Sequence, residues 1–195
     1  MKNHPKKIGL YTLVLLVSIL LVMPAVAEDT YKVDTAHTYI LFKVKHLGIG
    51  YSYGRFNNPV RTFTFDEAKN NIGVIDIRIL AKDVDTDVEK RDNHLRSPDF
   101  FDAKKHPLIS FKSTSVKKTG QGTYEISGNV TLLGKTQTVK AEAVQTGAGK
   151  DPWGKYRRGY EARFTLKRSE FGMEFMLGGV SDKVELTISV EGVRQ

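Results

Sequence analysis

The sequence predicts an all-β protein whose antiparallel strands, about eight in number, close into a barrel. Three observations predict it. Apolar residues recur at every second position through most of the chain after residue 30, turn residues separate these segments, and only one short segment has a helical pattern. Such alternation buries one face of a strand and leaves the other in water. A closed barrel has no free edges, and a two-sheet sandwich is the alternative.

The individual strands follow from the alternating positions. Ile40, Phe42 and Val44 alternate with more polar neighbours, and turn residues such as Asn57-Asn58-Pro59 mark the ends of such segments. The expected strands are residues 40–44, 60–65, 75–80, 108–116, 124–130, 139–143, 160–166 and 184–190.

A single helix is expected, from Thr86 to Leu95. Thr86 or Asp87 would provide its N-cap, and Pro98 would stop it. No linker or internal repeat divides the strands into separate domains.

Residues 1–27 have the pattern of a secretory signal peptide. Three lysines lie among the first seven residues, residues 8–23 carry no charge, and a small-residue ending predicts cleavage after Ala27. An uncleaved membrane anchor is the alternative, because the apolar run nearly reaches the roughly 17 residues that span a bilayer. The predicted organisation is therefore a signal peptide at 1–27 and one domain at 28–195.

The composition excludes several classes of protein. The chain has no cysteine, which excludes a disulfide scaffold, a cysteine metal site and a cysteine nucleophile. It has 30 Lys and Arg against 22 Asp and Glu, a net charge of +8. Because the charges alternate in sign along an exported chain, we expect a solvated surface and no nucleic-acid partner. The excess of positive charge is compatible with transient contact with an anionic membrane surface.

Several motifs follow one another along the chain, and the most specific is the block from Arg91 to Asp102. They are Tyr31-Lys32-Val33-Asp34-Thr35-Ala36-His37-Thr38, His46-Leu47-Gly48, Gly54-Arg55-Phe56, Arg91-Asp92-Asn93-His94-Leu95, Ser97-Pro98-Asp99-Phe100-Phe101-Asp102, His106-Pro107-Leu108-Ile109-Ser110-Phe111-Lys112-Ser113, Gly128-Asn129-Val130-Thr131-Leu132-Leu133-Gly134 and Phe171-Gly172-Met173. In these motifs the chain resembles the YceI-like family of periplasmic polyisoprenoid-binding proteins. Thr38 and Asn129 stand where that family usually has Ser and Asp.

The resemblance implies a fold, a ligand and a location. The fold would be an eight-stranded antiparallel lipocalin-like barrel with a short helix beside it. An apolar tunnel in the barrel would hold an isoprenoid lipid, either a polyprenyl pyrophosphate or a quinone-type tail. The protein would work in the bacterial periplasm, in transport, storage or stress protection of such a lipid, as a binding protein and not an enzyme.

The candidate tunnel residues are aromatic side chains and methionines. An isoprenoid tail gains affinity only from apolar surface that leaves water, so its site needs a continuous apolar lining. Inward positions of the strands would supply part of it, and apolar residues crowded outside the strands would form a mouth or plug. The expected lining is Phe42, Phe63, Phe65, Phe100, Phe101, Phe111, Tyr160, Phe164, Phe171, Met173 and Met176. An ordinary filled core is the alternative.

A lipid head group would need polar partners. A pyrophosphate would need cationic donors, for which Arg91 and His94 are candidates, and Arg168 would lie near the mouth. A quinone would need one or two neutral donors, for which His37 or His46 would serve. Alternatively, Arg91 and His94 only join the helix to the end of the barrel, and Arg168 forms a salt bridge with an acidic neighbour, Glu170 or Asp182.

Two further readings stay open. A metal-dependent periplasmic hydrolase would need the barrel to gather the four histidines of residues 28–195, although none has the spacing of a known metal motif. A ligand-free stress or interaction protein would have a fully packed interior. We expect no catalytic residue, metal or cofactor; an exposed barrel edge could support a homodimer.

Overall fold

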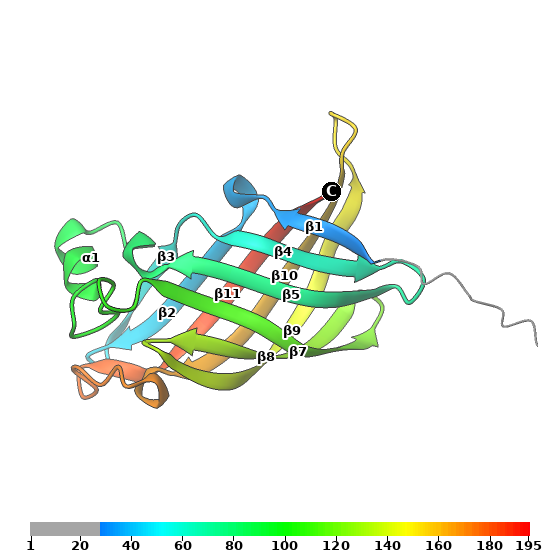
Figure 1. Cartoon of the computed structure of the whole chain (residues 1–195). Coiled ribbons are helices and arrows are strands. Elements are labelled where there is room, and N and C mark those ends of the chain that lie inside the picture. The colour runs from blue at the N-terminus through cyan, green and yellow to red at the C-terminus, as the bar shows by residue number, and fades with distance from the viewer. Residues whose placement is uncertain (1–27) are drawn as a thin grey trace, which may run out of the picture.

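The strands of this chain form one antiparallel sheet that closes on itself into a barrel (Figure 1). The computed structural model describes residues 28–195. The strands are β1 (Asp29–Val33), β2 (Tyr39–His46), β3 (Gly50–Phe56), β4 (Val60–Asp66), β5 (Asn71–Leu80), β6 (Val84–Asp85), β7 (Leu108–Gly120), β8 (Thr123–Leu132), β9 (Lys135–Lys150), β10 (Tyr156–Lys167) and β11 (Val180–Arg194).

The barrel is a ring of eight strands in the order β1-β4-β5-β7-β8-β9-β10-β11, and the pairing of β11 with β1 closes it. This ring confirms the predicted closed barrel and excludes the two-sheet sandwich. The long strand β11 pairs with β2 through Val180–Ser189 and then with β1 through Gly192–Arg194. A 3-10 turn, η1 (Thr35–His37), separates β1 from β2, so the two strands occupy successive parts of one edge of β11.

Strand β3 was not predicted from the sequence, because its apolar residues face the wrong way. Tyr51 and Tyr53 are exposed, whereas Ser52 and Gly54 alternate with them and are half-buried. One edge of β3 pairs with β2. Within the described part of the chain, its other edge pairs only with the two-residue strand β6. The helix and the loop that follows it lie at this end of the barrel (Figure 1).

The helix α1 (Glu89–Leu95) begins three residues later than predicted, and its N-cap is Val88. The expected cap from Thr86 or Asp87 is therefore wrong. Instead, the Asp92 carboxylate accepts hydrogen bonds from the Thr86 backbone N–H (2.9 Å) and hydroxyl (2.5 Å), which ties the helix to the end of β6. No helix within residues 28–195 combines the length and the apolar character that crossing a bilayer requires. The predicted signal peptide and its cleavage after Ala27 lie outside the described residues.

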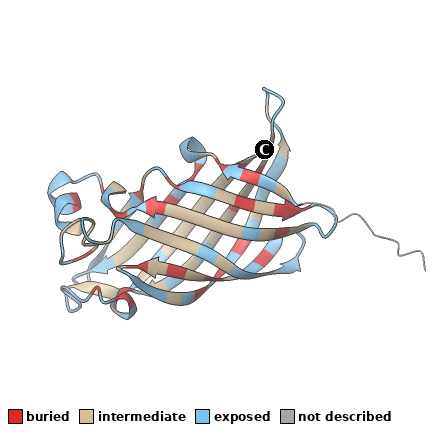
Figure 2. Ribbon diagram, in the orientation of Figure 1, coloured by how far each residue is buried: buried red, intermediate tan, exposed pale blue. Residues whose placement is uncertain are grey.

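The tightly packed part of the core lies at the end of the barrel opposite α1, which we call the base. Tyr31, Phe65, Ile72, Tyr124 and Tyr160 are there, each with at most 4% of its surface exposed. Nearer the middle of the barrel many strand residues are only half-buried, as the tan segments of Figure 2 show. The interior is therefore filled at the base and looser toward the helix.

Candidate ligand-binding cavity

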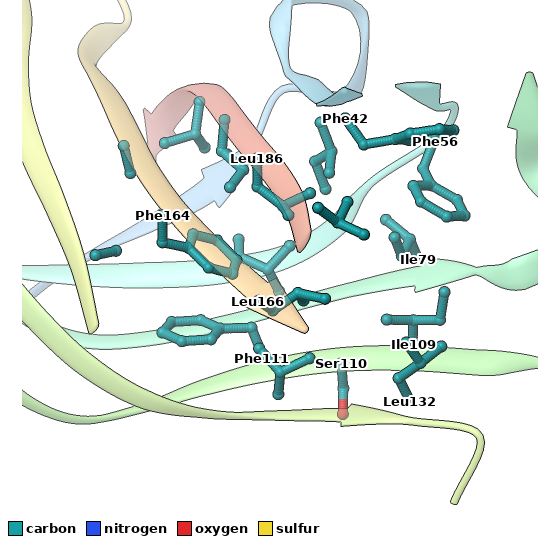
Figure 3. A pocket seen from close by; sticks show the side chains of 18 of the residues that line it. Phe42, Phe56, Ile79, Ile109, Ser110, Phe111, Leu132, Phe164, Leu166 and Leu186 are labelled. Atoms are coloured by element: carbon teal, nitrogen blue, oxygen red, sulfur yellow. The ribbon is translucent and has the colours of Figure 1, made fainter. Parts of the chain in front are cut away.

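An apolar cavity occupies the inside of the barrel. Its volume is about 240 Å³. On β10 its lining comprises alternate residues from Tyr160 to Leu166, which span about 20 Å along the strand. Apart from Thr38, Ser110, Tyr160 and Arg168, every lining side chain is aliphatic or aromatic, or is a methionine. Figure 3 shows the Ser110 hydroxyl directed away from the cavity.

The cavity exists because inward-facing side chains do not meet across the barrel. Phe42, Phe111 and Phe164 point inward, yet they remain half-buried (Figure 3). A packed barrel would bury such residues almost completely, so the filled-core alternative is wrong. Two glycines widen the space: a β-carbon at Gly54 or Gly128 would overlap the ring of Phe42 or Phe111, respectively. Without those β-carbons, each ring can lie against the barrel wall.

Most of the predicted tunnel residues line this cavity. The strand residues do so because period two correctly assigns their inward face, and the other three come from the loops at the helix end. They are Phe42, Phe63, Phe100, Phe101, Phe111, Tyr160, Phe164 and Met173.

Three predicted tunnel residues lie outside the lining. Phe65 is fully buried within the closed base, where the Arg158 guanidinium carbon is 3.6 Å from the centre of its ring. Phe171 is 1% exposed and packs behind the lining in the cluster that contains Phe100. Met176 is 45% exposed in a surface loop. The alternation of apolar residues shows which face of a strand points inward. It does not show how far along the barrel a residue lies, and it does not apply to loops.

The sequence analysis selected aromatic residues and thereby missed most of the aliphatic lining. The signal was available, because these residues occupy inward positions of the same alternating strands. Phe56 was missed for another reason, since its strand β3 was not expected. The aliphatic lining includes Ile40, Val44, Ile75, Ile77, Ile79, Ile109, Leu132, Leu166, Val184, Leu186, Ile188 and Val190.

Arg168 lies in the cavity wall, but its guanidinium group is engaged by the backbone. It is 2% exposed and donates hydrogen bonds to the carbonyl oxygens of Met173 (2.9 Å), Val180 (2.9 Å) and Ser181 (3.0 Å). Burial lowers the pKa of this guanidinium. The predicted alternative, a salt bridge with Glu170 or Asp182, does not form within the described residues. Arg168 therefore fastens the loop that follows η3 (Arg168–Phe171) to the start of β11.

The two candidates on the helix also have structural partners. Arg91 donates to the hydroxyl (2.7 Å) and carbonyl (2.8 Å) oxygens of Thr86, which joins the helix to the end of β6. His94 is 2.8 Å from an Asp99 carboxylate oxygen, and its ring packs edge-to-face with both Phe100 and Phe175. Neither residue lines the cavity. The contacts of Arg91 match the structural alternative given by the sequence, whereas His94 joins the helix to the loop that follows it.

The other two histidine candidates, His37 and His46, lie on the surface. His37 belongs to η1 and is 3.0 Å from an Asp34 carboxylate oxygen, with 63% of its side chain exposed. His46 is exposed at the end of β2, near the helix end of the barrel. The five predicted head-group residues are therefore not brought together, and only Arg168 reaches the cavity wall.

The base of the barrel contains a buried polar cluster. Arg158 is 5% exposed and donates to the Tyr31 hydroxyl (3.0 Å) and to a Glu67 carboxylate oxygen (2.5 Å). The hydroxyls of Tyr124 and Tyr160 are buried without a hydrogen-bond partner. Burial raises the pKa of both hydroxyls, so both stay protonated at neutral pH. The positive charge of Arg158 is paired with the Glu67 carboxylate.

One group of three potential metal ligands occurs in residues 28–195: Asp34, His37 and Glu191. Arg157 occupies it, because its guanidinium donates to Asp34 (2.6 Å) and Glu191 (2.5 Å) and also to Asp151 (2.7 Å). This group contains only one histidine, so the barrel does not gather the histidines into the site that a metal hydrolase would need.

Comparison with known proteins places the chain in a family. The YceI-like domain family matches residues 31–192. A UPF0312 protein of Pseudomonas aeruginosa is 46% identical over 173 residues, covering 88% of this chain and 90% of the relative. A UPF0312 protein of Pectobacterium carotovorum is 45% identical over 169 residues, covering 87% and 88% of the two chains.

Solved structures share the same barrel. The YceI protein of Campylobacter jejuni has a TM-score of 0.72 at 30% identity and covers 77% of this chain and 90% of its own. BcnA of Burkholderia cenocepacia has a TM-score of 0.73 at 23% identity, covering 82% and 98%. A Saccharophagus degradans domain described as polyisoprenoid binding has a TM-score of 0.66 and covers 85% of this chain and 98% of its own. Its sequence identity is 11%, so this comparison shows the fold alone. By its match to the family and its close relatives, this chain belongs to the YceI-like family.

Proposed function

We propose that this protein binds a polyisoprenoid lipid, with the prenyl tail inside the barrel cavity. The observation that carries the proposal is the apolar, partly empty interior that extends from the base to the helix end. A prenyl tail offers no group for hydrogen bonding, and this wall offers almost none in return. The shared fold with a domain described as polyisoprenoid binding supports the same assignment.

The head group, either a pyrophosphate or a quinone ring, would stay near the helix end. The base is closed by packed side chains, and its buried cation Arg158 is paired with Glu67. Arg168, at the other end, is bonded to three carbonyl oxygens. With Arg158 and Arg168 engaged in this way, the apolar cavity wall suits the tail, whereas the exposed residues around the helix end suit the polar head.

The cellular role that fits is transport, storage or protection of the lipid outside the cytoplasm. The predicted signal peptide at residues 1–27 supports export to the periplasm. A binding role requires no catalytic group, and we assign none. Homodimer formation stays a prediction.

Mass spectrometry of an organic extract tests the proposal. The protein would be purified from its native compartment alongside an Ala162→Trp variant, whose larger side chain would occupy the cavity. We expect a near-stoichiometric prenyl lipid from the natural protein and much less from the folded variant. A natural protein that is folded and carries no lipid, and that takes none up when it is offered, would overturn the proposal.

A further inference from the structure

Two loops place exposed apolar side chains at the helix end of the barrel. Leu47 and Ile49, in the turn between β2 and β3, are 54% and 89% exposed, and Phe175, Met176 and Leu177 are 39–45% exposed. We call these five residues the rim. The loops touch, because the Leu47 N–H donates to the Gly179 carbonyl oxygen (2.6 Å). Figure 1 shows the end of β2 and the orange loop after η3 side by side.

The fold does not require large apolar residues at these places. Leu47 and Met176 have φ values of +51° and +55°, in the left-handed region where Gly or Asn is favoured. About half of each side chain is exposed, so burial offsets only part of the backbone strain. Strain of this kind at exposed positions is typical of functional segments.

The rim is continuous with the cavity wall. Val44 and Val180, which line the cavity, lie within a few residues of the two rim loops. The Phe175 ring packs against Phe100, another lining residue, with 5.4 Å between ring centres. An apolar surface therefore leads from the exposed rim to the interior of the barrel.

Next to the rim, the outer face of the barrel carries tyrosine and lysine. Tyr51 is exposed beside Ile49, and Lys45, Lys167 and Lys183 project from neighbouring strands. Lys167 and Lys183 are direct register partners, and these three lysines form no ion pair within residues 28–195. Glu174 is the exposed acid of the rim loop. Apolar residues at the tip, followed by Tyr and Lys, match the layers of a bilayer from acyl chains to anionic head groups.

We propose that the rim docks on the surface of an anionic lipid bilayer. Its apolar side chains enter the upper acyl region, while the tyrosine and the lysines meet the head groups. The helix end of the cavity then faces the membrane, where a prenyl tail resides. This inference rests on the proposed function for its purpose, but docking is measurable without any prenyl lipid.

Intrinsic fluorescence provides the test. Trp153 is the single tryptophan; it is 81% exposed in the loop between β9 and β10, at the base end of the barrel. The experiment uses the chain from residue 28, which contains every described strand, so that the apolar run of residues 8–23 does not contribute. It compares this chain with the double variant Trp153→Phe/Ile49→Trp on vesicles of phosphatidylcholine, with and without one quarter phosphatidylglycerol.

The new tryptophan at position 49 should shift its emission to the blue on the anionic vesicles and be quenched by brominated acyl chains. Trp153 in the natural chain should do neither. A Leu47→Asn/Ile49→Thr variant should bind the anionic vesicles at least fivefold more weakly, whereas Val74→Thr/Val144→Thr, on exposed strand positions away from the rim, should bind normally. Added salt should weaken binding of the natural chain.

Equal vesicle binding by the rim variant, or no spectral shift at position 49, would overturn the proposal. Self-association that the rim substitutions abolish, without vesicle binding, would instead identify the rim as an interface between two copies. A natural protein that docks on vesicles but never retains a prenyl lipid would leave docking intact and contradict the proposed function.

Discussion

Phe42 and Gly54 face each other across the β2–β3 pair, and the phenyl ring of Phe42 occupies the space that a β-carbon on Gly54 would need. The other close neighbour is the Thr86 methyl group, so the atoms nearest to this position belong to side chains. Because Phe42 borders the cavity, its ring has room to move inward. The absence of one methyl group on the wall therefore sets part of the width of the cavity.

Gly54→Ala should push this ring into the cavity and weaken the binding of long prenyl chains more than that of short ones. The fold should tolerate the change within about 1 kcal/mol, because crowding and the better strand propensity of Ala oppose each other. Affinity for a short and a long prenyl compound, measured beside the melting temperature, checks this. Gly147→Ala, where a β-carbon meets nothing within 4 Å, is the matched control. Equal losses for both chain lengths would contradict the role of Gly54.

Tyr124→Phe and Tyr160→Phe should leave stability unchanged or raise it slightly. Each hydroxyl is buried without a partner, so its removal relieves a desolvation penalty of about 1 kcal/mol or more. Urea denaturation of the two variants measures the change in the free energy of unfolding. A loss above about 1 kcal/mol in either variant would mean that its hydroxyl has a hydrogen-bond partner in solution.

Arg168→Met should destabilise the lipid-free protein by about 3 kcal/mol, because three carbonyl oxygens lose a charged donor. Chemical denaturation of delipidated protein measures this structural effect without a ligand. If stability is unchanged while affinity for a prenyl pyrophosphate falls, then Arg168 is a head-group ligand, as the sequence suggested, and not a loop fastener.

Acid should weaken the fold through Asp34. Its hydrogen bond from Arg157 holds the pKa of the Asp34 carboxyl at about 2, below its ordinary value. A depressed carboxyl pKa stabilises the fold above the unfolded-state pKa, about 4, and this contribution disappears as the pH falls toward 2. Asp34→Asn should remove about 1 kcal/mol of this pH dependence, since solvent screens part of the interaction. Unfolding measured at pH 6 and at pH 3 checks the prediction: an unchanged pH dependence in the variant would contradict it.

The barrel could be predicted because most of its strands alternate apolar and polar residues and because the motifs occur in order. The inward positions of Phe42, Phe111 and Phe164 followed from the same alternation. Strand β3 could not be predicted in this way, since it places Gly54 inward and Tyr51 outward to make room for the cavity. The departure from the expected pattern therefore occurs where the barrel makes space.

The head-group residues were harder to predict for a different reason. Arg91, His94 and Arg168 all occur in or beside motif segments, and a sequence does not reveal whether a donor is already engaged. In the structure, Thr86, Asp99 and backbone carbonyl oxygens satisfy them, respectively. The pattern of residue types in a sequence does not show which side chains donate hydrogen bonds to the backbone.

Affinity as a function of tail length tests the central proposal most directly. Prenyl compounds with one head group and an increasing number of isoprene units would be titrated into the delipidated chain from residue 28. Each added unit of five carbons removes apolar surface worth roughly 4 kcal/mol gross from water, of which binding retains a fraction. We predict that affinity rises with each unit until the cavity is full, and that Ala162→Trp ends the rise earlier. Affinity that does not depend on tail length would contradict the proposal that the barrel interior holds the tail.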